Sequence, residues 1–369
     1  MRFLLTLAVL GAGFCLASDC GAAELKFYVG SSGPGAEGIL TSSLDSETGV
    51  LSQPKLLAKV QHASFQALSP DGRHLYSVLE AAAGRLGSFR VEADRLQPLN
   101  EVDAKGAGPC HVWVDAAGRN LLAANYVSGS VACFPIRADG SLGEASSVVQ
   151  HAGTGPDTNR QTGPHAHGIY TDRNDRFVYV PDLGTDDVFI YRYDPEGGRL
   201  LPSEPKSGRV TPGGGPRHLA LHPGGRFAYV CNEMGLTVTA FEVDSATGGL
   251  KSIQEVGTLP EGAPRKGVTL AEIFCHPNGK FVYVSNRGHD SLTVFASGED
   301  GRLALVENVA GVPATPRGFA LSPDGRWLVC AGQGAGTLNA YRIDPTTGRL
   351  TDTRQAVPAK AASCILFAR

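Results

Sequence analysis

The sequence has little of what builds long helices, binds nucleic acid or crosses membranes. It contains only two methionines in 369 residues, and no segment keeps a helical apolar period for more than about three turns, so we expect no major helix. The formal net charge is only −3, which gives no basic footprint for nucleic acid, and we expect no such partner. Beyond the first 23 residues, no stretch is apolar enough to span a bilayer.

The first residues have the pattern of an export signal. One apolar run, Phe3 to Leu16, follows a single positive charge, and small residues at 21–23 suit cleavage before Glu24. We therefore expect a signal peptide over residues 1–23 and a single mature domain over 24–369. The protein would then be periplasmic or secreted, with no stable membrane insertion after cleavage. An uncleaved membrane anchor is the alternative.

The cysteines of the mature chain show no metal-binding spacing. Most of them stand inside apolar strand-like runs, so we expect buried free thiols, although pairing in an oxidising compartment remains the alternative. The six are Cys110, Cys133, Cys231, Cys275, Cys330 and Cys364.

Glycine and proline are abundant, with 47 and 23 residues, and they occur in a repeated unit. The unit is a short apolar run, a Pro-x-Gly-Arg turn and an aromatic-rich strand, which together predict a β-hairpin. Clear copies lie at 69–76, 222–229, 276–283 and 322–328, and weaker ones at 115–119 and 171–176. An alternating strand follows each copy, starting near Gly84, Gly129, Asp187, Leu236, Ser291 and Gly336.

The two ends of the mature chain share one further copy of the repeat. The segment Gly38 to Leu51 follows a strand at Leu25 to Val29 but lacks an inner strand, whereas the apolar segment Ala362 to Phe367 lacks a following hairpin. Seven units of about 49 residues predict an all-β, seven-bladed β-propeller, closed by pairing of the C-terminal strand with the N-terminal strands. A two-sheet sandwich is the alternative, and the absence of a Gly-His…Trp-Asp signature argues against a WD40 protein.

In a propeller the starts of the innermost strands and the ends of the second strands meet at one mouth of the central channel. Here these positions carry many polar and ionisable groups, which are costly to bury unless they are paired, so we expect a functional site. A purely structural ring of ion pairs is the alternative. The inner-strand positions are His62, Ser64, Cys110, His111, His165, His167, Arg217, His218, Glu272 and Arg317, and the second-strand positions are Glu80, Asn125, Asp182, Asn232, Glu233, Asn286, Arg287 and Gln333.

Several of these segments carry a family resemblance. The segments 163–168, 181–184, 215–220, 231–233, 285–290 and 316–320 together resemble the bacterial β-propeller lactonase family. That family includes propeller-type 6-phosphogluconolactonases and is similar to the fungal carboxymuconate lactonizing enzymes. The resemblance runs from about Phe27 to Phe367. It implies a seven-bladed propeller that acts on lactones, with no cofactor and no obligatory metal.

By matching motifs, the resemblance places the catalytic residues at His167, Arg217, Glu233 and Arg287. We expect the two arginines to bind a carboxylate or phosphate and to offset charge that develops on the lactone oxygen. We expect His167 to transfer the proton, with Glu233 either orienting it or pairing with an arginine. The reversed assignment, with Glu233 as the base, stays open.

Five further residues are candidates for binding substrate: His165, His218, Glu272, Arg317 and Asp182. A direct pair between Glu272 and Arg317 is the structural alternative for those two. A metal site made by His165, His167 and Asp182 is a lesser possibility. Two long loops, at 153–162 with Arg160 and at 257–267, could act as lids or be ordinary exposed loops.

The expected activity is hydrolysis of a sugar-acid lactone, either 6-phosphogluconolactone-like or an unphosphorylated aldonolactone. Export favours the unphosphorylated substrate, because phosphorylated sugars are cytosolic. The expected partner is a small anionic lactone or sugar-acid substrate. A muconate-type lactonizing isomerase and a non-catalytic binding propeller are the alternatives.

Overall fold

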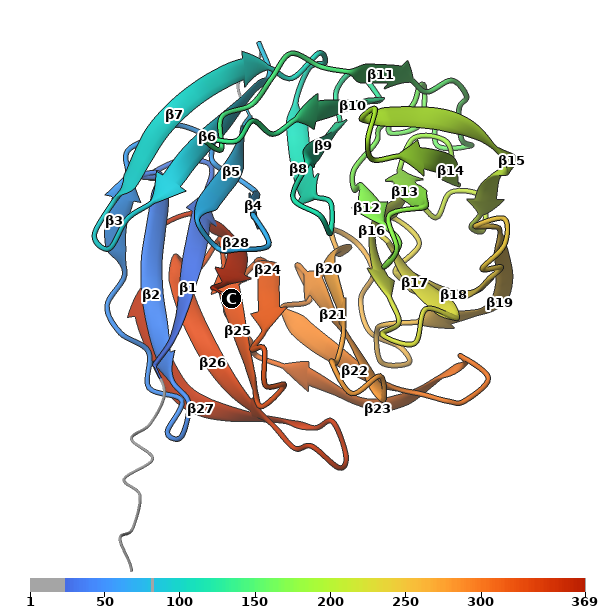
Figure 1. Ribbon diagram of the computed structural model, residues 1–369. Helices are drawn as coiled ribbons and strands as arrows, with labels where there is room; N and C mark the ends of the chain where they lie inside the picture. Colours follow the sequence, from blue (N-terminus) through green and yellow to red (C-terminus); the bar gives the residue numbers. More distant parts are fainter. Residues whose placement is uncertain (1–23, 81–82, 369) are drawn as a thin grey trace, which may run out of the picture.

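The computed structural model describes residues 24–80 and 83–368. Within these residues the chain forms 28 β-strands and no helix. The strands make seven four-stranded antiparallel sheets, or blades, arranged around a central axis (Figure 1). The prediction of an all-β, seven-bladed propeller is therefore confirmed. The predicted signal peptide lies outside the described residues, and no helix of the described part is long and apolar enough to cross a membrane.

The blades follow the order of the chain, and we number them from the N-terminus, with strands given from the innermost outward. Blades 1 to 3 are β28 (Ala362–Phe367), β1 (Glu24–Ser31), β2 (Ile39–Asp45) and β3 (Lys55–Ala58); β4 (Gln66–Leu68), β5 (His74–Leu79), β6 (Arg85–Val91) and β7 (Leu96–Asp103); and β8 (Pro109–Val114), β9 (Asn120–Asn125), β10 (Ser130–Pro135) and β11 (Ser147–Gln150).

Blades 4 to 7 contain the remaining strands in sequence order. They are β12 (Tyr170–Thr171), β13 (Phe177–Asp182), β14 (Asp187–Asp194) and β15 (Arg199–Arg209); β16 (Pro216–Leu221), β17 (Phe227–Asn232), β18 (Thr237–Val243) and β19 (Leu250–Gly257); β20 (Thr269–Cys275), β21 (Phe281–Arg287), β22 (Ser291–Ser297) and β23 (Leu303–Ala310); and β24 (Pro316–Leu321), β25 (Trp327–Gly332), β26 (Thr337–Ile343) and β27 (Leu350–Pro358).

The repeated Pro-x-Gly-Arg motif forms the turn between the first and second strands of a blade. Its glycine has a positive φ in five blades, for example 70° at Gly72 and 72° at Gly225. Glycine adopts this left-handed conformation without steric cost. In the degenerate copy of blade 4 the position is taken by Asp175, with φ of 51°. The predicted alternating strands begin at or within one residue of the expected positions, as β14 does at Asp187.

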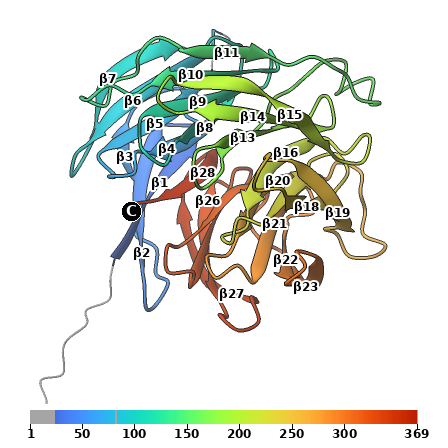
Figure 2. The same ribbon diagram turned by 45° about the vertical axis from the view of Figure 1, so that its right-hand side comes forward.

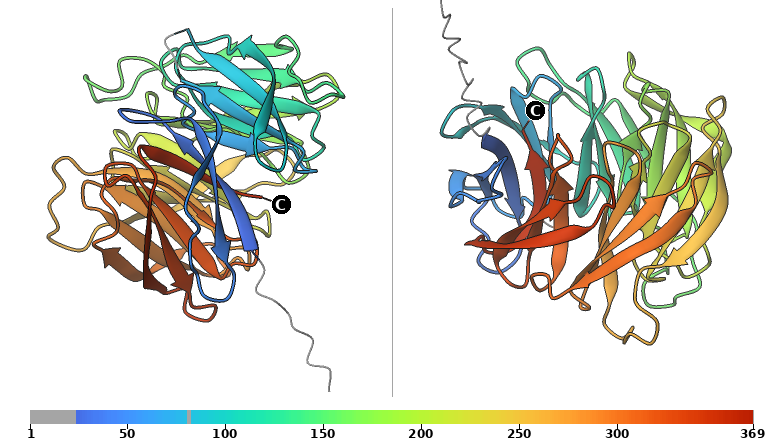
Figure 3. Two further views of the ribbon diagram at one scale, coloured as in Figure 1. Left: turned by 90° about the vertical axis from the view of Figure 1, so that its left-hand side faces the viewer. Right: turned by 90° about the horizontal axis from the view of Figure 1, so that it is seen from below.

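Apolar side chains fill the space between each pair of neighbouring blades. Seen from the side, the sheets stand face against face around the ring (Figure 3). Aromatic residues add hydrogen bonds between blades: the Tyr76 hydroxyl donates to the Gly140 carbonyl at 3.1 Å and Tyr283 to the Gly348 carbonyl at 2.9 Å. Burial of such apolar side chains contributes about 1.5–3 kcal/mol each, so the contacts between blades hold the ring together.

The ring is closed by the two ends of the chain, as predicted. Strand β28 is the innermost strand of blade 1 and pairs antiparallel with β1, with Val29 opposite Ile365. Figures 1 and 2 show the red C-terminal strand beside the blue N-terminal strand. Trp327 Nε1 of blade 7 donates to the Ser46 carbonyl of blade 1 at 2.9 Å. Pairing removes the exposed edge that either end would otherwise present.

The six cysteines of the described part are free, and five of them are buried. This agrees with the expectation of buried thiols. Burial raises the pKa of Cys231 and Cys330 to about 12, so these thiols are protonated and unreactive.

Candidate active site at the centre of the ring

The side chains of the candidate site stand on irregular starts of the innermost strands. In β16, Pro216 pairs with Asn232 and His218 with Cys231, so Arg217 is an extra residue without a partner on β17. The same bulge occurs in three other inner strands, at Cys110, Arg317 and the pair Ala271–Glu272. A bulge re-aims a side chain out of the regular alternation. Strand alternation therefore does not separate Arg217 from His218, and both reach the centre.

Glu233 lies where the candidate arginines meet. Its Oε2 atom is 3.1 Å from Arg217 Nε and 3.1 Å from Arg287 Nη2, while Oε1 accepts from Arg160 Nη2 at 3.0 Å. The Glu233 backbone is fixed on both sides, because its N–H donates to Gly215 and its carbonyl accepts from Leu270. Three guanidinium groups thus converge on one carboxylate, which leaves an excess of positive charge.

The charges around Glu233 control its protonation. Burial alone would raise its pKa, but the charges of Arg287, Arg217 and Arg160 outweigh burial and hold the pKa below its ordinary value. Glu233 is therefore a carboxylate at neutral pH. Burial and the repulsion from Arg217 lower the pKa of Arg287 to about 10, so this guanidinium is still charged at neutral pH. It also donates to the Leu270 carbonyl at 2.7 Å.

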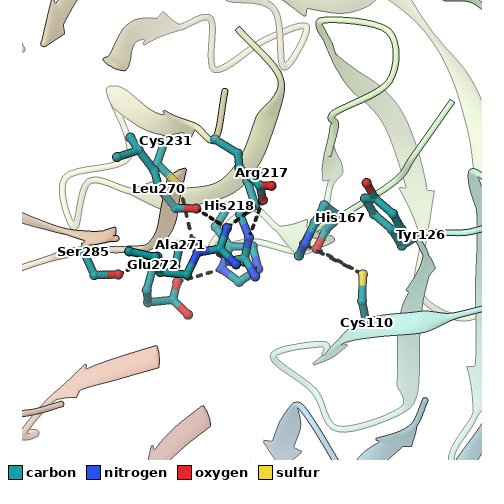
Figure 4. A network of polar contacts seen from close by, with 12 residues as sticks. Cys110, Tyr126, His167, Arg217, His218, Cys231, Leu270, Ala271, Glu272 and Ser285 are labelled. Atoms are coloured by element: carbon teal, nitrogen blue, oxygen red, sulfur yellow. Dashed lines mark hydrogen bonds and ion pairs between the residues drawn. The ribbon is translucent and has the colours of Figure 1, made fainter. Parts of the chain in front are cut away.

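A second buried pair, His218 and Glu272, lies beside Arg217 (Figure 4). Arg217 Nη1 is 3.2 Å from His218 Nε2 and also donates to the Ala271 carbonyl. Because a guanidinium can only donate, Nε2 must be the accepting nitrogen. The ring proton is then on Nδ1 and donates to Glu272 Oε1 at 2.7 Å. The alternative of a direct Glu272–Arg317 pair is wrong, since Glu272 pairs with His218.

Burial dominates the protonation of this second pair. It raises the pKa of Glu272 to about 8, against the lowering effects of Arg217 and Arg317. Burial, reinforced by Arg217 and Arg317, holds the pKa of His218 well below its usual value. At neutral pH the imidazole is therefore uncharged, and both of its nitrogens are engaged. His218 serves as a support for Arg217 and has no nitrogen free to take up a proton from substrate.

His167 stands on the other side of the centre and keeps one nitrogen available. Its Nδ1 atom faces the Cys110 sulfur at 3.8 Å, and its ring contacts those of Tyr126 and His218 at centroid distances of 5.3 and 5.2 Å. No hydrogen bond joins Nε2 to another residue in the described part of the chain. Burial and the charge of Arg217 hold the His167 pKa well below its usual value. His167 is accordingly a neutral imidazole near the arginines.

The remaining candidates lie around this centre at different depths. His165 is half-buried, stacks on Tyr126 at 4.6 Å and donates from Nδ1 to the Tyr126 carbonyl. Arg317 is half-buried as well, and burial together with the charge of Arg217 lowers its pKa. The His111 ring packs against His218 at a centroid distance of 5.3 Å. These three residues border the cluster without contacting Glu233.

Asp182 is the candidate that the structure does not bring into the centre. Its side chain is 0% exposed and pairs with the equally buried His151, Oδ2 to Nδ1 at 2.6 Å. The other oxygen, Oδ1, accepts from the backbone N–H groups of His165 and Gly184 at 2.7 and 3.0 Å. Both of its oxygens are therefore engaged, one by His151 at the edge of blade 3 and the other by two backbone N–H groups of the segments next to β12 and β13. Asp182 therefore holds the segment before β12 and cannot contact a substrate in this arrangement.

Two polar residues of the cluster are absent from the candidates that the sequence singled out for substrate or catalysis. Tyr126 follows β9 and accepts a hydrogen bond from Arg160 Nη2 at 3.1 Å. Arg160 comes from the connection between β11 and β12, and its contact with Glu233 spans 73 positions of sequence. The length of the 153–162 loop was the signal for Arg160, since long loops in compact domains are often functional.

The described residues contain no group of three or more His, Cys, Asp or Glu side chains placed to hold a metal ion. In particular, Asp182 turns toward His151 and is not shared with the two histidines of the 163–168 segment.

Fold and centre together define a seven-bladed propeller with a cationic cluster built on the innermost strands. The chain belongs to the family described as lactonase, 7-bladed beta-propeller, whose model matches residues 26–367. It is 37% identical to a 6-phosphogluconolactonase of Bacillus subtilis over 346 residues, covering 92% of this chain and 97% of the relative. It is 31% identical to a 6-phosphogluconolactonase of Serratia proteamaculans, covering 83% and 88% of the two chains.

A solved structure shows the same fold. The periplasmic gluconolactonase of Pseudomonas aeruginosa superimposes with a TM-score of 0.88 at 32% identity, covering 94% of this chain and 99% of that one.

Proposed function

We propose that the protein is a lactonase that hydrolyses a sugar-acid lactone at the central cluster, either 6-phosphogluconolactone or an unphosphorylated aldonolactone. The observation that carries the proposal is the position of Arg217 and Arg287, both held on Glu233 Oε2. Preorganised cations of this kind stabilise the negative charge that develops on a carbonyl oxygen during attack by water. The names of the relatives in the same family support the same activity.

In this proposal His167 is the general base. A water molecule attacks the lactone carbonyl carbon, His167 takes one proton from that water, and the carbonyl oxygen becomes an oxyanion facing the arginines. The tetrahedral intermediate then collapses, the bond between the carbonyl carbon and the ring oxygen breaks, and the imidazolium returns the proton to the ring oxygen. The product is the open hydroxy acid, which exits as a carboxylate. A single residue thus acts first as base and then as acid.

Glu233 is the less suitable base. Both of its oxygens contact guanidinium groups, and those charges hold its pKa below the ordinary value. Because both of its oxygens are held by guanidinium groups, Glu233 is poorly placed to accept a proton from water, whereas His167 Nε2 has no partner among the described residues. We therefore assign Glu233 to holding the arginines in place and His167 to proton transfer.

The test is a pH-stat measurement of hydrolysis of 6-phosphogluconolactone, gluconolactone and muconolactone by the purified protein. Conservative variants Arg217→Lys and Arg287→Lys keep the charge but lose the planar fork, and we expect kcat to fall about 100-fold. His167→Gln should lower kcat by about 100-fold or more on the same substrate. Turnover of none of these lactones above the double Arg→Lys variant would reject the proposal, and turnover of muconolactone alone would favour an isomerase.

We also propose that residues 1–23 are a signal peptide and that the mature protein, a single domain over 24–369, is periplasmic or secreted. The apolar run and the small residues before Glu24 support this, as does the periplasmic relative in Pseudomonas aeruginosa. Sequencing the N-terminus of protein recovered from a periplasmic fraction should give Glu24 as the first residue. A cytosolic protein with an intact N-terminus would contradict the proposal.

A further inference from the structure

Arg160 differs from the other two arginines on Glu233 in its exposure. The Arg160 side chain is 41% exposed, compared with 16% for Arg287 and 3% for Arg217. Arg217 is thus the most deeply buried of the three arginines, and Arg160 is the one on the solvent side. Of the three arginines that contact Glu233, Arg160 is therefore the one most accessible to a group that stays near solvent.

The loop that carries Arg160 is built to hold it in place. It belongs to the β11–β12 connection, residues 151–169, which is longer than the corresponding connections of the other blades. Asp157 Oδ1 accepts from the backbone N–H of Arg160 at 3.0 Å, and the Asp157 carbonyl accepts from Gln161. Gln161 is 0% exposed and donates to the Leu183 carbonyl and to Asp186 Oδ1 at 2.8 and 2.7 Å. Arg160 is therefore presented by an ordered turn.

Arg160 keeps binding capacity that its present partners do not use. Both of its hydrogen bonds, to Glu233 and to the Tyr126 hydroxyl, come from Nη2. No residue of the described part accepts from Nε or Nη1, so three of the five N–H groups of the guanidinium remain free to donate to a second anion. Charge-assisted hydrogen bonds from such N–H groups to a phosphate or carboxylate oxygen are among the strong ones in proteins.

The excess of positive charge around Glu233 also favours an anionic ligand. Glu233 neutralises one of its three arginines, and the pKa of about 8 for Glu272 leaves that nearby carboxyl mostly protonated at neutral pH. A neutral lactone would leave this positive charge uncompensated. A lactone with an anionic substituent would compensate it, and such a substrate places its carbonyl at the inner arginines while its distant substituent lies toward solvent.

We propose that Arg160 recognises an anionic group of the substrate, a phosphate ester or a carboxylate distant from the lactone carbonyl, and so makes the site selective for charged lactones. This inference rests on the proposed lactonase function and adds the substrate class. Arg160 acts on specificity and binds the part of the substrate that does not react. Glu233 holds the guanidinium in position while its free N–H groups contact the anion.

The test compares Arg160→Gln and Arg160→Lys with Arg265→Gln as a matched control. Arg265 is an exposed arginine on the other long loop, and it donates to the Gly235 carbonyl without contacting Glu233. The substrates are 6-phosphogluconolactone, glucarolactone with its free carboxylate, and neutral gluconolactone. If kcat/KM for 6-phosphogluconolactone depends on Arg160, the recognised group is a phosphate. If kcat/KM for glucarolactone depends on it, the group is a carboxylate.

We expect Arg160→Gln to lower kcat/KM for the anionic lactone at least about tenfold, mainly through KM, and to change gluconolactone less than about threefold. Arg160→Lys should retain part of the selectivity, and Arg265→Gln should retain all of it. An equal loss on neutral and anionic lactones would overturn the inference, because it would mean that Arg160 acts only through Glu233. The inference would also be overturned if Arg160→Gln showed the same kinetics as the control variant Arg265→Gln.

A binding measurement separates this inference from the lactonase proposal. Inorganic phosphate, titrated calorimetrically, should bind the wild-type protein at least about tenfold more tightly than Arg160→Gln. If the wild-type protein opens no lactone, the proposed function fails, and the phosphate titration alone decides whether Arg160 binds anions. Equal phosphate affinities in the two proteins would overturn the role of Arg160 even if lactones are hydrolysed.

Discussion

Glu272 is the buried acid whose protonation couples the central cluster to pH. Its backbone N–H donates to Ser285 Oγ at 3.0 Å, and its carboxyl accepts from His218, so it cannot move toward solvent. Contact with solvent therefore does not offset the rise in the Glu272 pKa that burial causes. The same environment that keeps Glu272 protonated keeps His218 neutral, and a neutral pair is compatible with the charged Arg217 next to it.

We predict that Glu272→Gln flattens the dependence of stability on pH. The folded-state pKa of Glu272 is about 8, compared with 4.5 in the unfolded chain. The folded protein then holds a proton that the unfolded chain loses, so this stabilisation is complete below pH 4.5 and is lost as pH rises through 8. The slope reaches at most about 1.4 kcal/mol per pH unit. Denaturant unfolding at several pH values measures it.

The effect of Glu272 on stability is best measured at pH values above the ordinary histidine pKa of about 6.5. Below this pH, the low pKa values that burial gives His111, His167 and His218 mean that the unfolded chain takes up protons before the folded protein does. Their contribution to stability therefore rises with pH, opposite to that of Glu272. From there to pH 8, wild-type stability should fall while Glu272→Gln stays nearly constant. Glu47→Gln, at an exposed pair with Arg326, should follow the wild type. A variant profile parallel to the wild type would contradict the raised pKa.

At the scale of the strand, blade 4 differs from the other blades in the length of its innermost strand. Its innermost strand β12 has only two residues, and the segment before it touches β13 through a single bridge between Ala166 and Asp182. Asp182 replaces the missing ladder by accepting from two backbone N–H groups and from His151. The position of His167 thus depends on a carboxylate that does not itself enter the centre.

We predict that Asp182→Ala destabilises the protein by at least about 3 kcal/mol, because it leaves the N–H groups of His165, Gly184 and His151 without an acceptor. Since the segment that carries His167 loosens, kcat should fall as well. Denaturant unfolding and a lactone assay measure the two effects. Asp187→Ala, which removes partly exposed contacts to Arg209 and Ser207, should cost less than about 1 kcal/mol. Equal losses in both variants would argue against the role of Asp182.

Strands and turns could be predicted because their signals are local. The Pro-x-Gly-Arg turns need a left-handed residue, and this requirement marks hairpins directly, as at Gly72 and Gly225. The bulges were missed, although a proline precedes the extra residue in three of the four, as Pro216 precedes Arg217. Regular strand alternation does not hold at these positions, which form the site.

The contacts within the site were harder to predict, because they depend on the path of loops. The motifs placed Arg217, Glu233 and Arg287 near one another, since Arg217 and Arg287 stand on an inner and a second strand and Glu233 directly follows a second strand, and this geometry repeats. Arg160 reaches Glu233 from a loop without a repeat, and Asp182 turns to His151 of a different blade edge. No local pattern encodes either contact.

At the scale of the whole molecule, the chain closes its ring in the middle of blade 1. The single hydroxyl hydrogen of Ser363 in β28 is shared between the Gly30 carbonyl of β1 and the Ser64 carbonyl at the start of blade 2, with Oγ 3.3 and 3.0 Å from the two oxygens. The C-terminal strand therefore joins the first two blades as well as completing the first. Because β28 is an inner strand, it also faces the centre in which the candidate site lies (Figure 1).

We predict that a chain ending at Ala361 does not fold, whereas a circular permutant that keeps β28 does. Truncation exposes the edge of β1 and the apolar clusters on both of its sides. The permutant begins at Ala362 and joins Ala368 to Leu25 through a two-residue Asn-Gly turn. That turn is short enough because the Ala368 N–H already donates to the Lys26 carbonyl at 2.8 Å.

In the permutant every blade is one continuous segment, and the ring is closed by packing between blades 7 and 1 together with side-chain contacts such as Trp327–Ser46, Gln333–Ser32 and Arg326–Glu47. We expect the native circular dichroism spectrum and a cooperative transition, but faster unfolding in denaturant, because no strand ties the two chain ends together. The truncated chain should show no cooperative transition. If it unfolds cooperatively with native stability, closure by β28 does not hold the ring; if the permutant fails to fold while the wild type does, packing between blades is insufficient without the shared blade.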